Sequence, residues 1–415
     1  MPDLERKIAS PVSRRTFIKG AGLTGVAAFL AACAPGGGAT SAPTAAPTTE
    51  PGATPAPTPE PTPKVATGPL KFANWTAYID LVGAASDAGE YQPGSSPTIE
   101  AFQQQFGVEV DYEEKVDDNN SFIATIKPAL VSGLATGWDL MVLTDWMAAK
   151  VISSQWAEKL DQANVPNCVT NLRDPLRNQV WDPTNDYHYP WQSGMTGIGY
   201  NTTAFSENGL AAPTKLADLW NVPANKLTFL SEARDTFGLA LLKLGINPDP
   251  ATVTDADLQA VHDDIKPLVD AGLRFTGNSY LEEFGQKKVW AAFVWSGDLA
   301  SSAGPDDVFV FPEEGTMIWT DNMLIPKGAT NKYTAELMMN FVYDPQIAAN
   351  IADWVYYVSP VNGVGPLIKD MDPGAESNPL LFPTDDIIAK QKNFQFLADA
   401  LESTMNDLFA DLSGV

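Results

Sequence analysis

Short apolar runs alternate with amphipathic stretches along most of the chain, from about residue 69 onward. Short runs rich in aromatic or β-branched residues are typical of strands, and apolar residues spaced three or four apart are typical of helices. The first half of the pattern predicts strands at 70–73, 108–113 and 139–143, alternating with helices at 96–106, 120–132 and 147–154. Such alternation indicates an α/β protein with a largely parallel sheet.

A glycine-rich, extended segment at 194–201 interrupts this alternation, and a second α/β set follows it. The second set predicts strands at 226–230, 290–295, 308–311 and 317–326, and helices at 232–244, 254–271, 333–342, 344–355 and 385–412. Two α/β units joined by extended crossings favour a two-lobed molecule with a hinged cleft. We expect lobe 1 to comprise residues 69–195 plus 322–366 and lobe 2 residues 196–321 plus 367–415.

Residues 1–32 have the pattern of an export signal. The stretch SRRTFIK at 13–19 resembles a twin-arginine signal. The apolar run at 21–32 is shorter than the roughly 20 residues that a membrane-spanning helix needs. It ends in LAAC at 30–33, which resembles a bacterial lipobox and implies cleavage before Cys33 and lipid attachment to it. The alternative is a chance cysteine in an apolar leader.

The lipidated Cys33 would be followed by a low-complexity segment, so that residues 33–68 form a tethered stalk. Residues 34–68 are dominated by Ala, Pro, Thr and Gly and include nine prolines. Such a composition buries too little apolar surface to fold, and its prolines favour an extended chain. We therefore expect a domain held away from the membrane by its lipid anchor, in the periplasm or at the cell surface.

The chain is strongly acidic, with 26 basic and 51 acidic residues and a net charge of −25. Without residues 1–32 the counts are 21 and 49, and the net charge is −28. This field repels the phosphates of nucleic acids, which argues against nucleic acid as a partner. It attracts cationic ligands, although solubility alone is an alternative reason for the acidity.

Signatures of catalysis and of metal binding are scarce. The sequence lacks HExxH, Walker A and GxSxG motifs, and Cys33 and Cys168 do not have the spacing of metal ligands. His188 is expected in a loop and His262 on a helix surface, so neither favours a catalytic triad. We expect a protein that is not an enzyme and uses no cofactor or metal. The alternative among enzymes is an exported enzyme that acts on an amine or a sugar.

Aromatic rings and carboxylates follow the ends of several predicted strands, where ligands of α/β proteins gather. Ring faces attract cations and pack methylene groups, and carboxylates form charge-assisted hydrogen bonds with ammonium groups. The combination therefore suits an aliphatic ligand with ammonium groups. The residues concerned are Trp75, Tyr78, Trp146, Trp295, Trp319, Asp321, Glu232 and Asp235. Two alternatives stay open: Trp295 could belong to the core, and Ser231 could be a helix N-cap with both acids in the first turn.

Seven segments in order resemble the spermidine/putrescine-binding proteins of bacterial ABC importers, over about residues 70–412. They are NWTAYID, WDLMVLTDW, DPTNDYHYPWQSGMTGIGYN, FLSEARDTFGLALLKLG, FVWSG, EEGTMIWTDNMLIP and WVYYVSPVNG. The resemblance implies a two-lobed periplasmic-binding-protein-like fold of type II. It also implies a monomer that captures polyamines and delivers them to the permease of an ABC transporter. The alternatives are a receptor for an amino acid or a cationic osmolyte, and an envelope adhesion or scaffold protein.

The resemblance also implies which residues contact the ligand. Trp146 stands where the family often has Tyr, and the acid pair runs Glu then Asp instead of Asp then Glu. An insertion at 82–97 is expected to be a surface loop, the alternative being ligand or permease contact. The implied aromatic contacts are Trp75, Tyr78, Trp295, Trp319 and Tyr357; the implied acids are Glu232, Asp235 and Asp321; the other polar contacts are Thr76, Thr144 and Gln395.

Overall fold

The structure is a computed structural model that describes residues 64–81, 95–302, 304–394 and 396–414. The predicted export signal, Cys33, nearly all of the stalk, Gln395 and residues 82–94 of the insertion lie outside the described residues. Among the helices described, none combines the length and the apolar character needed to cross a membrane.

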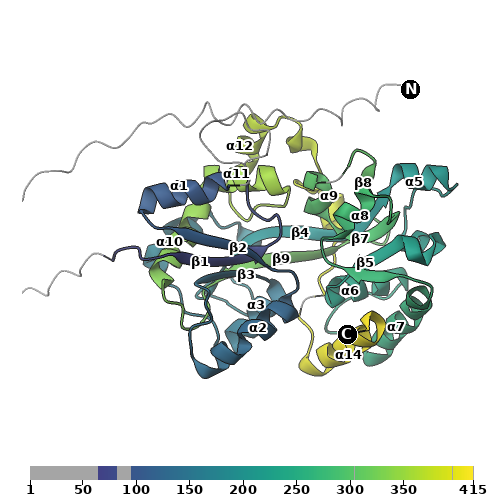
Figure 1. Cartoon of the computed structure of the whole chain (residues 1–415), viewed down its shortest axis with the longest axis horizontal. Helices are drawn as coiled ribbons and strands as arrows, with labels where there is room; N and C mark the ends of the chain where they lie inside the picture. Colours follow the sequence, from purple (N-terminus) through teal and green to yellow (C-terminus); the bar gives the residue numbers. More distant parts are fainter. Residues whose placement is uncertain (1–63, 82–94, 303, 395, 415) are drawn as a thin grey trace, which may run out of the picture.

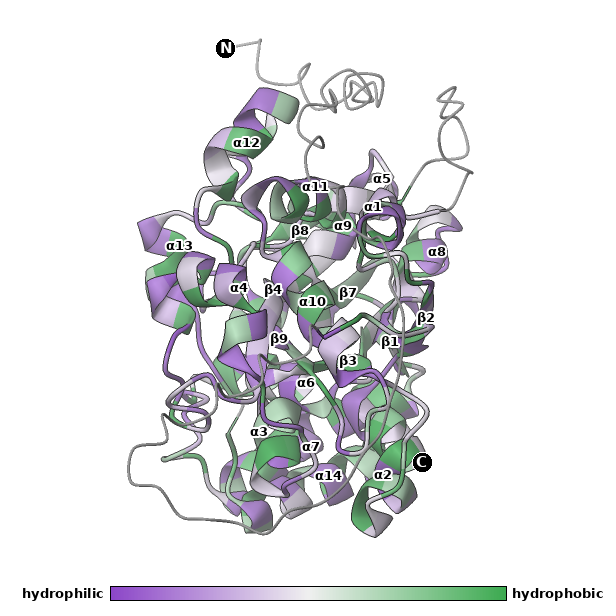
Figure 2. Cartoon of the chain, turned by 90° about the vertical axis from the view of Figure 1, so that its left-hand side faces the viewer, coloured by the Kyte–Doolittle hydropathy of each residue, from purple (hydrophilic) through white to green (hydrophobic). Residues whose placement is uncertain are grey.

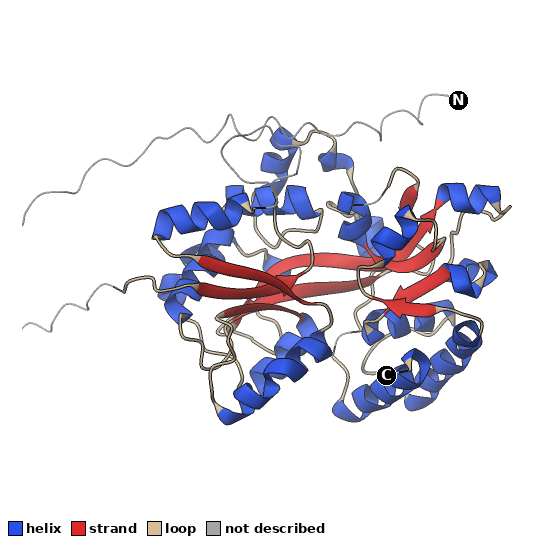
Figure 3. Cartoon of the chain, in the orientation of Figure 1, coloured by secondary structure: helices blue, strands red, loops and turns tan. Residues whose placement is uncertain are grey.

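One mixed β-sheet extends through both halves of the molecule (Figures 1 and 3). β1 pairs in parallel with β2 and β3, and β5 pairs in parallel with β6 and β7. Between these parallel parts, β9 and β4 lie side by side and antiparallel. The order is β2 (Val110–Val116), β1 (Leu70–Trp75), β3 (Leu140–Thr144), β9 (Met317–Leu324), β4 (His188–Asn201), β7 (Ala291–Trp295), β5 (Leu227–Leu230) and β6 (Arg274–Thr276), with β8 (Asp307–Val310) paired to β4.

Helices cover both faces of the sheet, and individual helices carry both hydrophobic and hydrophilic residues (Figure 2). Those near β1–β3 include α1 (Pro97–Phe106), α2 (Asn119–Ser132), α3 (Asp145–Ser153) and α10 (Lys332–Val342) (Figure 1). Those near β5–β8 include α5 (Thr202–Glu207), α6 (Ala233–Lys243), α7 (Asp255–Asp270), α8 (Tyr280–Gly285), α9 (Ser296–Ser302) and α14 (Asp399–Ser413). The remaining helices are α4 (Pro166–Asn171), α11 (Pro345–Val355), α12 (Val364–Met371) and α13 (Asp385–Lys390).

Local sequence signals explain where several elements begin and end. The Ser96 hydroxyl accepts a hydrogen bond from the Ile99 N–H at the start of α1, and Gly107 ends the helix at φ 66°. Thr254 and Asp257 form a capping box at the start of α7. The residues of β3 and β7 are almost all apolar and buried, as the predicted strands required. The strand–helix alternation expected from the hydrophobic pattern is therefore confirmed. The expectation of a largely parallel sheet is wrong, because β4 and β9 cross the middle of the sheet and pair antiparallel with all of their neighbours.

The single helix predicted at 385–412 is wrong. α13 ends at Lys390, and α14 begins only at Asp399. Between them, the Lys392 carbonyl accepts from the Ile318 N–H at 2.8 Å, and the Lys392 N–H donates to the Thr316 carbonyl at 2.9 Å. The chain therefore leaves the helix because its backbone pairs with the start of β9, a long-range contact that helical periodicity does not reveal.

His188 was expected in a loop but begins β4 and is fully buried. Its Nδ1 lies 2.7 Å from the Asp182 carboxylate, which also accepts hydrogen bonds from the backbone N–H groups of Asp186 and Tyr187. Burial lowers the pKa of His188, against the opposing effect of Asp182. The pair holds the turn that leads into β4, which is a structural role.

Candidate ligand-binding site

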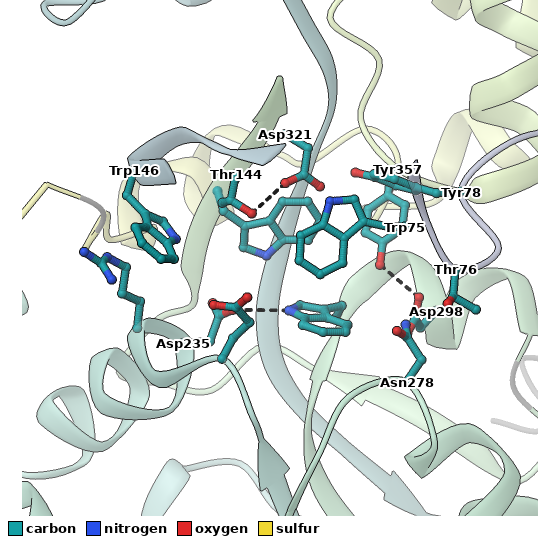
Figure 4. A pocket seen from close by; sticks show the side chains of 14 residues that line it. Trp75, Thr76, Tyr78, Thr144, Trp146, Asp235, Asn278, Asp298, Asp321 and Tyr357 are labelled. Carbon is teal, nitrogen blue, oxygen red and sulfur yellow. Dashed lines mark hydrogen bonds between the residues drawn. The ribbon is translucent and has the colours of Figure 1, made fainter. Parts of the chain in front are cut away.

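A cavity lies where several strand ends meet, and side chains from both halves of the molecule line it (Figure 4). About 490 Å³ of space lies between these side chains, part of it open to solvent. The lining includes every predicted site residue within the part of the chain that is described: Trp75, Thr76, Tyr78, Thr144, Trp146, Glu232, Asp235, Trp295, Trp319, Asp321 and Tyr357. Arg234, Asn278 and Asp298 also line it, and sequence reasoning missed all three.

The carboxyl ends of parallel strands place most of these side chains. Trp75 ends β1, Thr144 ends β3 and Trp295 ends β7, each directly before a turn or a helix. Glu232 and Asp235 lie at the start of α6, just after β5. Ligand-binding residues of α/β proteins gather at this edge, which is why residues distant in sequence converge here.

β9 places Trp319 and Asp321 on one side of the sheet, because residues two apart on a strand face the same way. The turn after β1 brings Tyr78 back towards the same space. Ala77 has φ 54° in that turn, and its N–H donates to Glu114 at 2.9 Å. One crossing strand and one turn thus add three further side chains to the lining.

The aromatic rings of the cavity pack on one another and directly on glycine backbone. The Tyr357 ring centroid lies 5.1 Å from that of Tyr78 and 5.3 Å from that of Trp319. A Cβ added at Gly194 would lie 2.4 Å from the Trp319 ring, and one added at Gly297 would lie 2.3 Å from the Tyr357 ring. Only glycine leaves room for the rings in these positions.

Asp321 and Asp235 are buried carboxylates that accept hydrogen bonds from neutral groups. Asp321 accepts from the Thr144 hydroxyl at 2.8 Å. Asp235 accepts from the Thr196 hydroxyl at 2.7 Å and from the Trp295 indole N–H at 3.2 Å. Burial raises the pKa of Asp321 to about 7 and that of Asp235 to about 6, because low-dielectric surroundings disfavour the charged form.

Glu232 does not serve as a helix cap through its side chain. It is the N-cap residue of α6 but makes no side-chain capping bond, so the interpretation of Ser231 as the cap is wrong. Instead, its carboxylate accepts from the Asn119 backbone N–H at 3.1 Å and from the Asn119 amide at 3.0 Å. Burial, with the charge of Asp118 as the next cause, raises the pKa of Glu232 well above its usual range.

Asp298 is a fourth buried carboxylate of the lining. It accepts from the Tyr280 hydroxyl at 2.5 Å, the Asn278 amide at 2.7 Å and the Tyr357 hydroxyl at 3.1 Å. Burial raises its pKa above the usual range. Asp298 could have been predicted as a site residue from its position, because it follows Trp295 by three residues and lies in the first turn of a helix after a strand. Asp235 follows β5 in the same way.

Arg234 is the one cationic residue in the described lining. Its guanidinium carbon lies 3.7 Å from the ring centroid of Trp146, which is a cation–π contact. One guanidinium nitrogen lies 3.3 Å from Glu402 of α14. Burial lowers the pKa of Arg234, and the nearby carboxylates of Glu402 and Glu232 oppose that effect. The lining therefore carries four carboxylates and one guanidinium.

No group of three or more His, Cys, Asp or Glu side chains arranged to hold a metal ion occurs among the described residues. The geometry instead offers an acidic cavity walled by aromatic rings, opening between two halves of an α/β molecule. Comparison with known families gives the class of the protein. Residues 98–383 match the family described as bacterial extracellular solute-binding protein, and the chain belongs to that family.

Individual relatives narrow the comparison. The spermidine/putrescine-binding periplasmic protein of Salmonella typhimurium is 28% identical over 324 residues, covering 77% of this chain and 85% of the relative. The putrescine-binding periplasmic protein PotF of Escherichia coli is 26% identical over 343 residues, with coverage of 77% and 85%. A solved structure described as a spermidine/putrescine ABC transporter from Listeria monocytogenes has a TM-score of 0.69 at 25% identity, covering 84% of this chain and 98% of that one. These findings confirm the predicted resemblance and the two-lobed binding-protein fold.

Proposed function

We propose that this solute-binding protein captures polyamines such as putrescine and spermidine and delivers them to an ABC importer. The observation that carries the proposal is the set of four buried carboxylates in one aromatic cavity, all of which accept hydrogen bonds from neutral donors. Burial penalises their negative charge. A ligand that brings ammonium groups relieves this penalty by charge-assisted hydrogen bonding.

The arrangement of the side chains suits an elongated ligand. Figure 4 places Trp146 on one side of the cavity and Asp298 with Asn278 on the other, and Asp235 and Asp321 between them in this view. Rings of the wall separate the acids, and ring faces pack methylene groups well. A ligand with ammonium groups joined by an aliphatic chain matches this order of polar and apolar surface.

The acidic lining also discriminates against the alternatives. An amino acid would bring a carboxylate into a lining with four buried carboxylates, and the one guanidinium there, that of Arg234, already lies against Trp146 and 3.3 Å from Glu402. Like charges in a desolvated site are strongly unfavourable. A quaternary ammonium osmolyte has no N–H group to donate to Asp235 or Asp321. Polyamines carry no carboxylate, and their ammonium groups have N–H donors. The name of the Salmonella relative, a spermidine/putrescine-binding protein, supports the same ligand class.

We further propose that the cavity closes between two lobes, 69–195 plus 322–366 and 196–321 plus 367–415. Two of the three proposed boundaries fall inside β4 and β9, the strands that lie in the middle of the sheet, and the third falls inside α12. The hydrogen bond from Asn119 of α2 to Glu232 joins the two sides. The sequence patterns of residues 1–33 support twin-arginine export and a lipid anchor on Cys33, which would hold the protein outside the cytoplasm. We also propose that the protein acts as a monomer, as the family resemblance implies.

Isothermal titration calorimetry tests the proposed ligand class. The chain would be titrated with putrescine, spermidine, glycine betaine and leucine. We expect at least one polyamine to bind with a Kd below about 10 µM, and leucine and betaine to show no saturable heat at about 1 mM. Absence of polyamine binding at that concentration would overturn the proposal, and preferential binding of leucine or betaine would replace it.

A further inference from the structure

We propose that Lys150 and Glu402 are positioning residues that hold the two proposed lobes together over a bound ligand, so that they slow its release without contacting it. This inference rests on the proposed function. Lys150 lies on α3, in the proposed lobe 1, and Glu402 lies on α14, in the proposed lobe 2. Neither residue is among the described residues that line the cavity.

An ion pair joins α3 to α14 directly. The ammonium nitrogen of Lys150 lies 3.0 Å from Oε1 of Glu402. Fully exposed ion pairs contribute little, because water and salt screen them. Here the Lys150 side chain is 47% exposed, but that of Glu402 is only 11% exposed. The screening is therefore weaker than at an open surface, and we expect the pair to contribute measurably to lobe closure.

The other oxygen of Glu402 makes a second link to α3. It lies 3.3 Å from the guanidinium of Arg234 on α6. That guanidinium lies flat against lobe 1, with 3.7 Å between its carbon and the centroid of the Trp146 ring on α3. Burial lowers the pKa of Arg234, and the carboxylates of Glu402, Glu232 and Asp235 oppose that effect. Glu402 thus shares in holding the cation that stacks on α3.

Helical geometry puts both links on one face of α3. Trp146 and Lys150 are four residues apart, and residues with that spacing are neighbours on the surface of a helix. Figure 1 shows α3 in the half that contains β1–β3, and α6 and α14 in the half that contains β5–β8. One face of α3 therefore meets two helices of the opposite half, and the Glu402 carboxylate contacts one cation from each half.

The ion pair between Lys150 and Glu402 involves protein groups alone, so it forms with any ligand over which the lobes close. A ligand enters while the lobes are apart, when this pair is not formed. Release requires the lobes to separate and the pair to break. The pair should therefore lower the dissociation rate and leave the association rate nearly unchanged, by the same factor for every ligand.

Stopped-flow kinetics of Lys150→Gln tests the inference, with the full chain, putrescine and spermidine. We expect the dissociation rate to rise at least about threefold for both ligands, and the association rate to stay within about twofold of the parent rate. Lys150→Arg, which keeps the positive charge, should retain the parent dissociation rate within about twofold. In about 1 M salt, the parent rate should approach that of Lys150→Gln, because the pair is then screened.

Lys159→Gln is the matched control. Lys159 pairs with Asp186 at 3.0 Å, the same distance, but both residues belong to the proposed lobe 1. The substitution removes the same charge and a similar ion pair without affecting a contact between the lobes, so the dissociation rate should stay within about 1.5-fold of the parent rate.

Glu402→Gln removes both links to α3 and should raise the dissociation rate further than Lys150→Gln does. Circular dichroism would establish that this variant folds. Because Lys150 is half exposed and contributes little to either lobe by itself, Lys150→Gln decides the question if Glu402→Gln does not fold.

Two outcomes would overturn the inference. Equal dissociation rates in Lys150→Gln and Lys159→Gln would show that the pair does not hold the lobes together. A rate that changes for one ligand alone would show that Lys150 acts on the ligand itself. Failure of the parent chain to bind either polyamine differs from both, because it removes the proposed function itself.

Discussion

Replacing Asp321 with asparagine should weaken polyamine binding and stabilise the protein at the same time. The substitution keeps an oxygen that can accept from the Thr144 hydroxyl, which lies 2.8 Å from the Asp321 carboxylate. The new amide can donate to the Tyr78 hydroxyl, which lies close enough to Asp321 to influence its pKa. The shape of the site is therefore retained, and the main change is the loss of one ionisable group.

The magnitude follows from the pKa of Asp321, which burial raises from 3.8 to about 7. Because the folded pKa exceeds the unfolded one, the folded state holds its proton over a pH range in which the unfolded state has lost it. Stability from this group is fully present below the unfolded pKa and is lost as the pH rises through about 7. The difference between 3.8 and about 7 corresponds to about 4 kcal/mol as an upper value.

Urea unfolding of the parent chain and Asp321→Asn at two pH values measures this effect. At about pH 8 we expect the variant to be more stable by about 2 kcal/mol. This is less than the upper value because burying the new asparagine amide group has a desolvation cost of its own. At about pH 4 the gain should nearly vanish, because the parent carboxyl is then protonated in the folded protein. Polyamine affinity at pH 8 should fall by well over about tenfold, since a desolvated charge pair is lost.

Asp145→Asn is the matched control for this experiment. Burial raises the pKa of Asp145 to about 7 as well, and its carboxylate accepts from the Asn322 amide at 2.9 Å, but it does not line the cavity. We expect a similar gain in stability at pH 8 and an affinity within about threefold of the parent. If Asp321→Asn lowers stability equally at both pH values, or leaves affinity unchanged, the reasoning about a penalised binding carboxylate is refuted.

Two further predictions follow from the site. Polyamine affinity should rise with pH through the range of about 6 to about 7, because Asp235 and Asp321 must lose their protons to pair with ammonium groups. Calorimetry near pH 6.5 should then show that binding releases protons, seen as a binding enthalpy that depends on the buffer. A constant affinity across this pH range would contradict the prediction. Gly297→Ala should weaken binding by at least about tenfold, because the new methyl group would displace the Tyr357 ring, whereas Gly285→Ala, where a Cβ meets nothing within 4 Å, should leave affinity and melting temperature nearly unchanged.

Residues that follow strong local patterns were predictable from the sequence. Trp75, Thr144 and Trp295 end strands whose apolar runs are short and clear, and such strand ends meet at one edge of a parallel sheet. Trp319 and Asp321, which lie on a crossing strand, were also selected as a ring and an acid close together in the sequence, and the ordered resemblance added Tyr357 and Thr76. Local pattern and resemblance together therefore select most of the described cavity lining.

Residues that depend on long-range contacts could not be predicted. Asp298 joins the site through Asn278 and Tyr280, which follow the three-residue strand β6, too short to stand out as a pattern. Arg234 is oriented by Glu402, a residue far along the chain in a helix whose start was misplaced. Periodicity reports which face of an element is buried but not which distant element covers it.

The two strands that connect the halves of the sheet also hold part of the cavity. Thr196 of β4 donates to Asp235 and accepts from the Trp319 indole N–H, and Asp321 lies on β9. With closure about these strands, as proposed, the ligand sits near the fulcrum of a lever. Points at a fulcrum move least, while the outer helices travel farthest. A permease that contacts those outer surfaces would receive a large geometric signal of occupancy, although the contacts around the ligand change little. The residues that set ligand specificity and the surface residues that the permease recognises could then change independently of one another.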